Sequence, residues 1–319
     1  MNLSPADSYA KSKARSKFPK TNRFAESFPF ELDPFQIEAC HALEDGKGVL
    51  VAAPTGAGKT IVGEFAVDLV INSGGKCFYT TPIKALSNQK FTELSAKYGE
   101  SKIGLLTGDT SINSEAQIVV MTTEVLRNMI YANSTTINDL KYVVMDEVHY
   151  LADKFRGAVW EEILIHLSDA VQVISLSATV SNAEEFGEWL QTVRGETEVI
   201  VSEIRPVPLY QHVLFGNRLL DLFGENQKLN PELTRLERDS YRQVRGNWRD
   251  KAKGPKQLTR AEIVEKLDRE GLLPAITFIF SRNNCDAAVR QCLAAGLRLT
   301  NSQERSEIRL VIARNMKNL

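Results

Sequence analysis

The stretch "GVLVAAPTGAGKT" (residues 48–60) joins a short apolar run to a glycine-rich loop that ends in Gly-Lys-Thr. The residues that follow, "IVGEFAVDLV" (61–70), have helical periodicity. A strand, a glycine-rich loop and a helix in this order are the setting of a phosphate-binding loop. Gly56 and Gly58 let backbone N–H groups converge on phosphate oxygens, and the start of the helix adds the positive end of its dipole. The stretch therefore predicts a P-loop that binds a nucleoside triphosphate.

Within this loop, Lys59 and Thr60 carry the chemistry. The Lys59 ammonium is expected between the β- and γ-phosphates, and the Thr60 hydroxyl is expected to ligate Mg²⁺. Ala53 stands where most P-loops have their first glycine, a departure that only some classes of nucleotide hydrolase show. A chance match to a glycine-rich turn is the alternative, and the Gly-Lys-Thr ending with its flanking strand and helix argues against it. The expected ATP contacts of the loop are Ala53, Pro54, Thr55, Gly56, Ala57, Gly58, Lys59 and Thr60.

A second stretch, "KYVVMDEVHYL" (141–151), places two adjacent carboxylates at the end of an apolar run. Burying carboxylates there is costly unless something neutralises them. In P-loop proteins an acid at this place holds Mg²⁺, and a neighbouring acid acts on the attacking water. Asp146 fits the first role and Glu147 the second. The predicted catalytic residues are Lys59, Asp146 and Glu147, and the predicted metal ligands are Thr60 and Asp146.

The same alternation of apolar runs and helical stretches continues along the chain from residue 28. Strands are expected at 48–53, 76–81, 102–108, 116–123, 141–145 and 171–179, and helices at 59–72, 83–98, 123–132 and 183–194. Strands that alternate with helices indicate an α/β fold built on a doubly wound, mostly parallel sheet. The continuous apolar character of the runs agrees, because parallel strands are covered on both faces.

Composition limits the possible classes of protein. The chain has 319 residues, enough for about two domains, and a net charge of −1, so any surface for nucleic acid must be local. No apolar run has the ~18 residues of a membrane span, and no secretory signal precedes the first domain. We expect a cytoplasmic protein without a membrane partner. The four cysteines are scattered, which disfavours a disulfide framework or a zinc site.

The motif "DEVH" (146–149) and the longer "DEVHYLADKFRGAVWEE" (146–162) resemble the superfamily 2 helicases, in particular the Ski-like branch of DEVH-box ATP-dependent RNA helicases. The resemblance covers about residues 28–215, with a weaker match at 274–295. It implies a RecA-like domain that uses ATP and Mg²⁺ to translocate along RNA and unwind it, with the RNA-decay machinery as a partner. The alternatives are a DNA helicase or translocase of the same superfamily, or a lobe that binds ATP without motor activity.

The resemblance assigns a role in adenine recognition to "FPFELDPFQIEAC" (28–40). Gln36 is implied to bind the adenine edge, with Phe30 or Phe28 stacking on its face. Taken without the resemblance, the residues favour a helix start capped by Asp33 with Pro34 at its first position, and Phe30 and Phe35 in the core. Both interpretations can hold together.

Further motifs are similar to those by which such helicases bind the nucleic-acid backbone. They are "TTPIKALSNQK" (80–90), "TGD" (107–109) and "MTTEVLRNM" (121–129). Their donors lie at the ends of expected strands, where an open α/β sheet presents its ligand site. A capped helix start is the structural alternative for the first of them. The implied nucleic-acid contacts are Thr81, Pro82, Lys84, Gln89, Thr107, Gly108, Thr122 and Thr123.

The motif "SAT" (177–179) is similar to the one that links ATP hydrolysis to strand separation. Ser177 and Thr179 are implied to bond toward Asp146 and His149. A buried histidine with satisfied hydrogen bonds is the plainer interpretation of His149 taken alone.

The domain organisation follows from these patterns. We expect a basic disordered tail at 1–27, a RecA-like ATP-binding domain at 28–202 and a linker with a basic stretch at 203–273. The apolar run "PAITFIF" (274–280) restarts the strand–helix pattern and is expected to be a strand, and "FSRNNC" (280–285) resembles the first motif of a second RecA-like lobe. Later helicase motifs have no match before Leu319, so this second lobe, 274–319, is expected to be truncated.

Overall fold

The structure is a computed structural model that describes residues 17–153, 156–178, 182–224, 228–245 and 258–316. The chain divides into two compact units, the first ending at Pro208 and the second starting at Leu209. This division lies inside the segment expected to be a linker. Each unit is described by itself. In the described residues, no helix is long and apolar enough to cross a bilayer.

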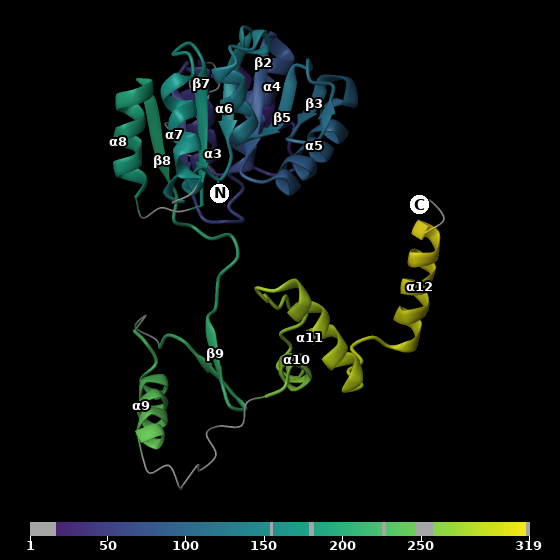
Figure 1. Ribbon diagram of the computed structural model, residues 1–319. Coiled ribbons are helices and arrows are strands. Elements are labelled where there is room, and N and C mark those ends of the chain that lie inside the picture. Colours follow the sequence, from purple (N-terminus) through teal and green to yellow (C-terminus); the bar gives the residue numbers. More distant parts are fainter. Residues whose placement is uncertain (1–16, 154–155, 179–181, 225–227, 246–257, 317–319) are drawn as a thin grey trace, which may run out of the picture. The chain divides into compact units, whose positions relative to one another are not determined.

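The first unit is built on one eight-stranded sheet (Figure 1). The strand order is β4-β3-β5-β2-β6-β7-β1-β8, and every neighbouring pair is parallel except β3 and β4. The strands are β1 (Gly48–Ala52), β2 (Lys76–Thr81), β3 (Ile103–Leu106), β4 (Ser111–Ile112), β5 (Ile118–Thr122), β6 (Leu140–Met145), β7 (Gln172–Ser177) and β8 (Thr197–Val201). The predicted doubly wound parallel sheet is confirmed, and β4 and β8 extend it at its two edges.

Helices cover both faces of this sheet (Figure 1). The helices are α3 (Pro34–Glu44), α4 (Thr60–Ser73), α5 (Lys84–Tyr98), α6 (Thr123–Tyr131), α7 (Gly157–His166) and α8 (Ala183–Arg194). Successive strand residues point to opposite faces, so each strand feeds two separate cores. In β1, Val49 and Val51 belong to the core under α3 and α4, whereas Leu50 belongs to the core with Trp160 of α7. This two-sided burial explains why the strands read as unbroken apolar runs.

Part of the expected disordered tail is ordered, which corrects the boundary at residue 27. Residues Pro19–Glu26 form helix α2, and its Phe24 side chain is 2% exposed in the core beside Phe65 of α4. Phe18 stacks on His41 with ring centroids 3.8 Å apart. The lysines and arginines dominate the composition of this segment, but the two phenylalanines provide enough apolar surface to dock the helix.

The second unit contains a hairpin and helices, and among its described hydrophobic residues Ala261 alone is buried. These elements are the hairpin β9 (His212–Phe215) and β10 (Arg218–Asp221) and the helices α9 (Pro231–Arg245), α10 (Arg260–Arg269), α11 (Arg282–Ala294) and α12 (Ser302–Met316). The expected strand at 274–280 is wrong, because these residues are irregular and Phe278 and Phe280 are fully or almost fully exposed. A strand needs a neighbour for its backbone groups, and no other described strand pairs with this segment.

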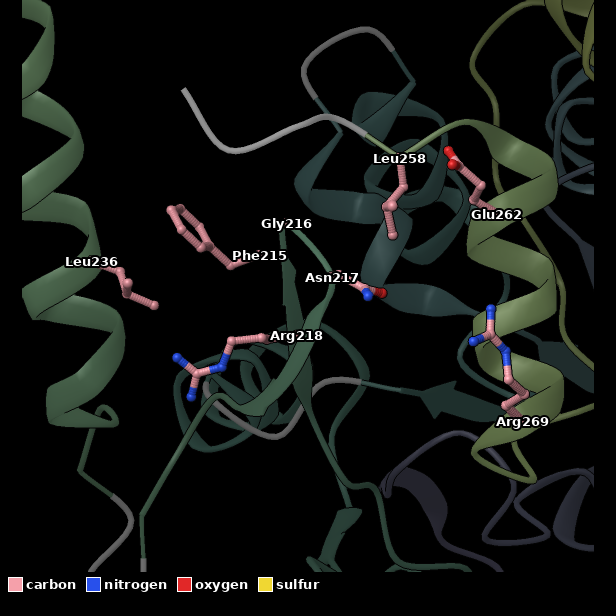
Figure 2. A pocket seen from close by; sticks show the side chains of 8 residues that line it. All are labelled: Phe215, Gly216, Asn217, Arg218, Leu236, Leu258, Glu262 and Arg269. Carbon is pink, nitrogen blue, oxygen red and sulfur yellow. The ribbon is translucent and has the colours of Figure 1, made fainter. Parts of the chain in front are cut away.

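A cavity of about 530 Å³ lies in this unit (Figure 2). Figure 2 shows Leu236 of α9 facing the turn of the β9–β10 hairpin, with Glu262 and Arg269 projecting from α10. Its polar groups are engaged locally: Arg218 pairs with Glu232 at 2.7 Å, and Glu262 completes the cap of α10. None of its lining residues belongs to the predicted site.

Candidate nucleotide-binding site

The P-loop connects β1 to α4 at the carboxyl edge of the sheet. Gly56 and Gly58 have φ values of +87° and +82°, which side chains with a Cβ rarely adopt. A Cβ on Gly58 would also lie 2.6 Å from Nε2 of Gln36. The loop conformation therefore requires both glycines, as the sequence predicted.

Lys59 points back into this loop. Its side chain is buried, and Nζ donates to the carbonyls of Ala53 at 2.8 Å and Pro54 at 3.2 Å. Burial lowers the pKa of Lys59, and the nearby carboxylates of Glu147 and Asp146 partly oppose this effect. A phosphate at the loop can take this ammonium in exchange for the two carbonyls, since a charged acceptor binds it more strongly than a neutral one.

The acid pair follows β6 directly. The Asp146 N–H donates to the carbonyl of Thr80, while its carboxylate accepts from the hydroxyl of Tyr79 at 3.1 Å and from the N–H of Glu147 at 3.0 Å. Burial raises the pKa of both carboxyl groups, and the charge of Asp146 raises that of Glu147 further. Two carboxylates held this close in a low-dielectric site are stabilised by a cation.

Glu147 has an unusual environment. Its backbone is left-handed (φ +55°), which turns the side chain out of the strand direction. Oε2 is buried without a hydrogen bond, although Nδ1 of His149 lies 3.2 Å away. That ring nitrogen also accepts from the N–H of Ala178 at 3.4 Å. An unpaired buried carboxylate oxygen is costly and fits a site that receives a water or cation.

These elements meet in one cavity of about 330 Å³. It is lined by Thr55, Gly56, Gly58, Lys59, Thr60, Thr81, Leu86, Gln89, Lys90, Asp146 and Glu147. The structure thus brings the P-loop and the acid pair together, as predicted. It also places two residues expected at the nucleic acid, Thr81 and Gln89, against the same cavity.

The donor set of this cavity fits Mg²⁺ together with a nucleotide. Mg²⁺ prefers oxygen ligands and is usually held by one or two protein groups, with phosphates and waters completing the shell. Thr60 and Asp146 provide one hydroxyl and one carboxylate. Among the described residues no group of three or more metal-ligating side chains is present.

Gln36 does not lie open to an adenine ring. Its side chain is 3% exposed, and Nε2 donates to the carbonyls of Gly58 at 3.0 Å and Ala57 at 3.4 Å. Oε1 accepts from the N–H of Asp33 at 2.9 Å, in the capping box of α3. In this structure Gln36 braces the P-loop. Phe30 is 54% exposed and remains available for stacking.

The motif expected to couple hydrolysis to strand separation contacts the acid pair through His149. The contact is the bond from the N–H of Ala178, the residue after Ser177, to the ring. Ser177 is buried at the end of β7, and Thr179 lies outside the described residues.

The residues expected at the nucleic acid fall into two groups. Thr81 and Thr123 are fully buried: the Thr81 hydroxyl is 2.7 Å from that of Ser87, and the Thr123 hydroxyl donates to the Thr81 carbonyl at 3.2 Å. These hydroxyls tie β2 to α5 and α6. Pro82 is also buried, and its carbonyl accepts from Arg156 at 3.3 Å. Lys84, Gln89 and Gly108 lie at the surface, Thr122 is half-buried, and Thr107 is buried at 6% exposure.

Sequence reasoning missed three side chains that the structure places here. Tyr79 donates to Asp146, Lys90 lines the phosphate cavity, and Asp109 pairs with Lys84 at 2.6 Å. Lys90 is 9% exposed, with Nζ 2.6 Å from Glu93 and 4.0 Å from Glu64. Asp109 belongs to the quoted "TGD" motif, but nothing in the sequence indicates its partner.

Residues 33–186 match the family model described as DEAD/DEAH box helicase. These residues are therefore similar to DEAD/DEAH box helicase domains. Helicases of this family use ATP, usually with Mg²⁺, in agreement with the cavity between the P-loop and the acid pair.

Relatives and a solved structure agree with this assignment. "Probable helicase HelY" of Mycobacterium leprae is 58% identical over 91% of this chain and 33% of its own length. "Antiviral helicase SKI2" of Saccharomyces cerevisiae is 36% identical over 92% of this chain and 27% of its own. The chain therefore spans about a third or less of the length of these relatives.

Among solved structures, the helicase Lhr of Mycobacterium smegmatis bound to ssDNA and AMP-PNP superposes with a TM-score of 0.51. The match covers 86% of this chain and 40% of that one at 23% identity, which supports the fold alone. The RecA-like helicase fold implied by the sequence is confirmed.

Proposed function

We propose that this chain contributes the ATP-binding motor domain of an ATP-dependent RNA helicase of the Ski-like branch. The observation that carries the proposal is the cavity in which Lys59 and Thr60 of the P-loop face Asp146 and Glu147. In this proposal residues 28–202 form the motor domain, 203–273 the linker and 274–319 the start of a second lobe. Translocation and unwinding are proposed for the whole protein, because this chain covers only 33% of the length of a relative such as HelY.

The residues of the cavity divide the work of ATP hydrolysis between them. The P-loop N–H groups and Lys59 hold the phosphates, and Thr60 and Asp146 would hold Mg²⁺, whose charge offsets the developing charge on the phosphates when it is bound. Glu147 accepts the proton of the attacking water through its unpaired Oε2. The raised pKa of Glu147 suits this role, because a general base works best when its pKa lies near the working pH.

In this proposal His149 transmits a change at the nucleotide site to the SAT motif. The ring lies between Oε2 of Glu147, at 3.2 Å, and the N–H of Ala178, at 3.4 Å. A shift of Glu147 during hydrolysis therefore changes the surroundings of His149 and, through it, those of Ser177. Thr179 has the same proposed role.

RNA is the proposed substrate, read without base specificity. The donors that remain accessible are exposed Lys84, Gln89 and Gly108 and half-buried Thr122. Contacts from such donors to the nucleic-acid backbone position a strand without reading its sequence. Support for RNA comes from the Ski-like sequence at 146–162 and from the 38% identity to the "DExH-box ATP-dependent RNA helicase DExH15 chloroplastic" of Arabidopsis thaliana. RNA-decay machinery is the partner proposed on the same basis.

The second candidate is a DNA helicase or translocase of the same superfamily, because donors that contact the backbone serve DNA as well as RNA. ATP hydrolysis measured with matched RNA and DNA oligonucleotides, in a protein of HelY length, separates the two. Stimulation by RNA well above that by DNA supports our proposal, and the reverse supports the DNA helicase. ATP binding without stimulation by either would show a nucleotide-binding module without motor activity.

A further inference from the structure

The exposed carboxylate of Asp109 accepts hydrogen bonds from the side chains of three residues. Lys84, the first residue of α5, donates from Nζ to Oδ2 of Asp109 at 2.6 Å. The hydroxyls of Thr107 and Thr110 approach Oδ1 of the same side chain at 3.1 and 3.4 Å. Asp109 lies in the loop after β3, so these contacts bridge two separate motifs.

Two of these donors, Lys84 and Thr107, belong to the set expected to bind the phosphates of the nucleic-acid backbone. A carboxylate and a phosphate present the same chemistry to them, an anionic oxygen that accepts from an ammonium and from hydroxyls. The side chains of Lys84 and Asp109 are 47% and 67% exposed, so an incoming strand can reach the pair.

We propose that Asp109 is an internal phosphate mimic, whose carboxylate holds Lys84 while no nucleic acid is bound and must release it before a backbone phosphate takes its place. The proposal rests on the proposed function. The hydrogen bond from Lys84 holds the pKa of Asp109 below its usual value, so the carboxylate is ionised at neutral pH.

Asp109 therefore makes a negative contribution to affinity. Binding replaces one ion pair of Lys84 by another, and the released carboxylate then faces the phosphates as a like charge. This exchange also favours release, because Asp109 can retake Lys84 when the phosphate leaves. A motor that moves along a strand must break its phosphate contacts at every step, and a built-in competitor lowers the cost of doing so.

The test is the affinity of the chain for a fluorescein-labelled single-stranded RNA oligonucleotide, measured by anisotropy at low salt. Asp109→Asn keeps the shape of the side chain and removes its charge. We expect binding to tighten roughly two- to fivefold, the range of a surface ion pair converted to affinity. A gain of affinity cannot result from misfolding.

The matched control is Glu115→Gln. Glu115 is also an exposed carboxylate paired with a lysine, at 2.9 Å from Lys76, and its loss changes the net charge equally. Lys76 begins β2, so this pair lies at the amino end of the strand, away from the proposed interface. We expect Glu115→Gln to leave the affinity unchanged. An equal gain in both variants would mean a general charge effect and overturn the proposal.

A double variant tests whether Asp109 acts through Lys84. In a Lys84→Ala background, Asp109→Asn should give little or no gain, because the cation that it frees is gone. An undiminished gain there, or no gain from Asp109→Asn alone while the parent chain binds RNA, overturns the inference and leaves the proposed function intact. A parent chain that binds neither RNA nor DNA overturns both.

Discussion

The variant Gln36→Ala distinguishes two roles for Gln36: adenine recognition, which the resemblance implied, and support of the P-loop, which its hydrogen bonds indicate. In the structure its amide bonds to the P-loop and to the cap of α3, at Gly58 O (3.0 Å), Ala57 O (3.4 Å) and Asp33 N (2.9 Å). The variant removes all of these bonds and leaves buried backbone groups without partners. Both the stability of the domain and the shape of the phosphate site should suffer.

The magnitudes follow from these contacts. At about 0.5–1.5 kcal/mol net for each hydrogen bond, with the 3.4 Å contact counted as weak, the free energy of unfolding should fall by about 2–3 kcal/mol. A P-loop without its brace must be ordered by the nucleotide, so affinity should fall roughly tenfold, equivalent to about 1.4 kcal/mol. The loss should be equal for ATP and GTP analogues, because the brace touches the loop and no base.

The assay combines urea denaturation with titrations of Mg²⁺ and non-hydrolysable ATP and GTP analogues. Gln172→Ala is the matched control, since its amide also donates to two backbone carbonyls, Lys47 at 2.9 Å and Leu43 at 3.3 Å, at the opposite edge of the sheet. It should lower stability and leave nucleotide affinity unchanged. If Gln36→Ala instead loses affinity for the ATP analogue alone, with unchanged stability, Gln36 reads adenine and our reasoning is refuted.

Two further predictions concern the acid pair and the helix before the domain. Glu147→Gln should keep nucleotide binding but slow ATP turnover by roughly 10²–10⁴-fold in a protein of HelY length; equal loss of binding and turnover would make Glu147 a metal ligand or a structural residue. Phe24→Ala should lower the free energy of unfolding, measured by urea denaturation, by about 3–5 kcal/mol, because Phe24 is buried in the core. Phe30→Ala, at an exposed position, should lower it by less than about 1 kcal/mol. Equally small losses in both variants would mean that α2 is not part of the fold.

The sequence predicted the features that local chemistry determines. The P-loop could be recognised because Gly56, Gly58 and Lys59 are needed together. The central strands could be recognised because short apolar runs between helical stretches are typical of buried parallel strands. The acid pair followed from its position after such a run. These are properties of short segments and do not depend on what lies nearby in space.

What the sequence left open depends on contacts between distant segments. Gln36 lies 22 residues from Gly58, and nothing local indicates that its amide faces the loop rather than a ligand. Asp109 and Lys84 are 25 residues apart in a sheet whose strand order no pattern reveals. The strand prediction for 274–280 was wrong because composition is a local property. The composition of this segment favours a strand, but a strand needs a neighbouring strand, and the described chain does not supply one.

The central claim is that the cavity between the P-loop and Asp146 binds the phosphates of ATP with Lys59 as their cation. Its most direct test is a calorimetric titration of Mg²⁺–ATP into the parent chain and into Lys59→Ala, with Lys97→Ala, an exposed lysine of α5 outside the cavity, as the control. We predict saturable binding for the parent chain and for Lys97→Ala, and a loss of about 10²-fold or more for Lys59→Ala, the scale of a charge-assisted contact of ~3 kcal/mol. Unchanged affinity in Lys59→Ala would contradict the account.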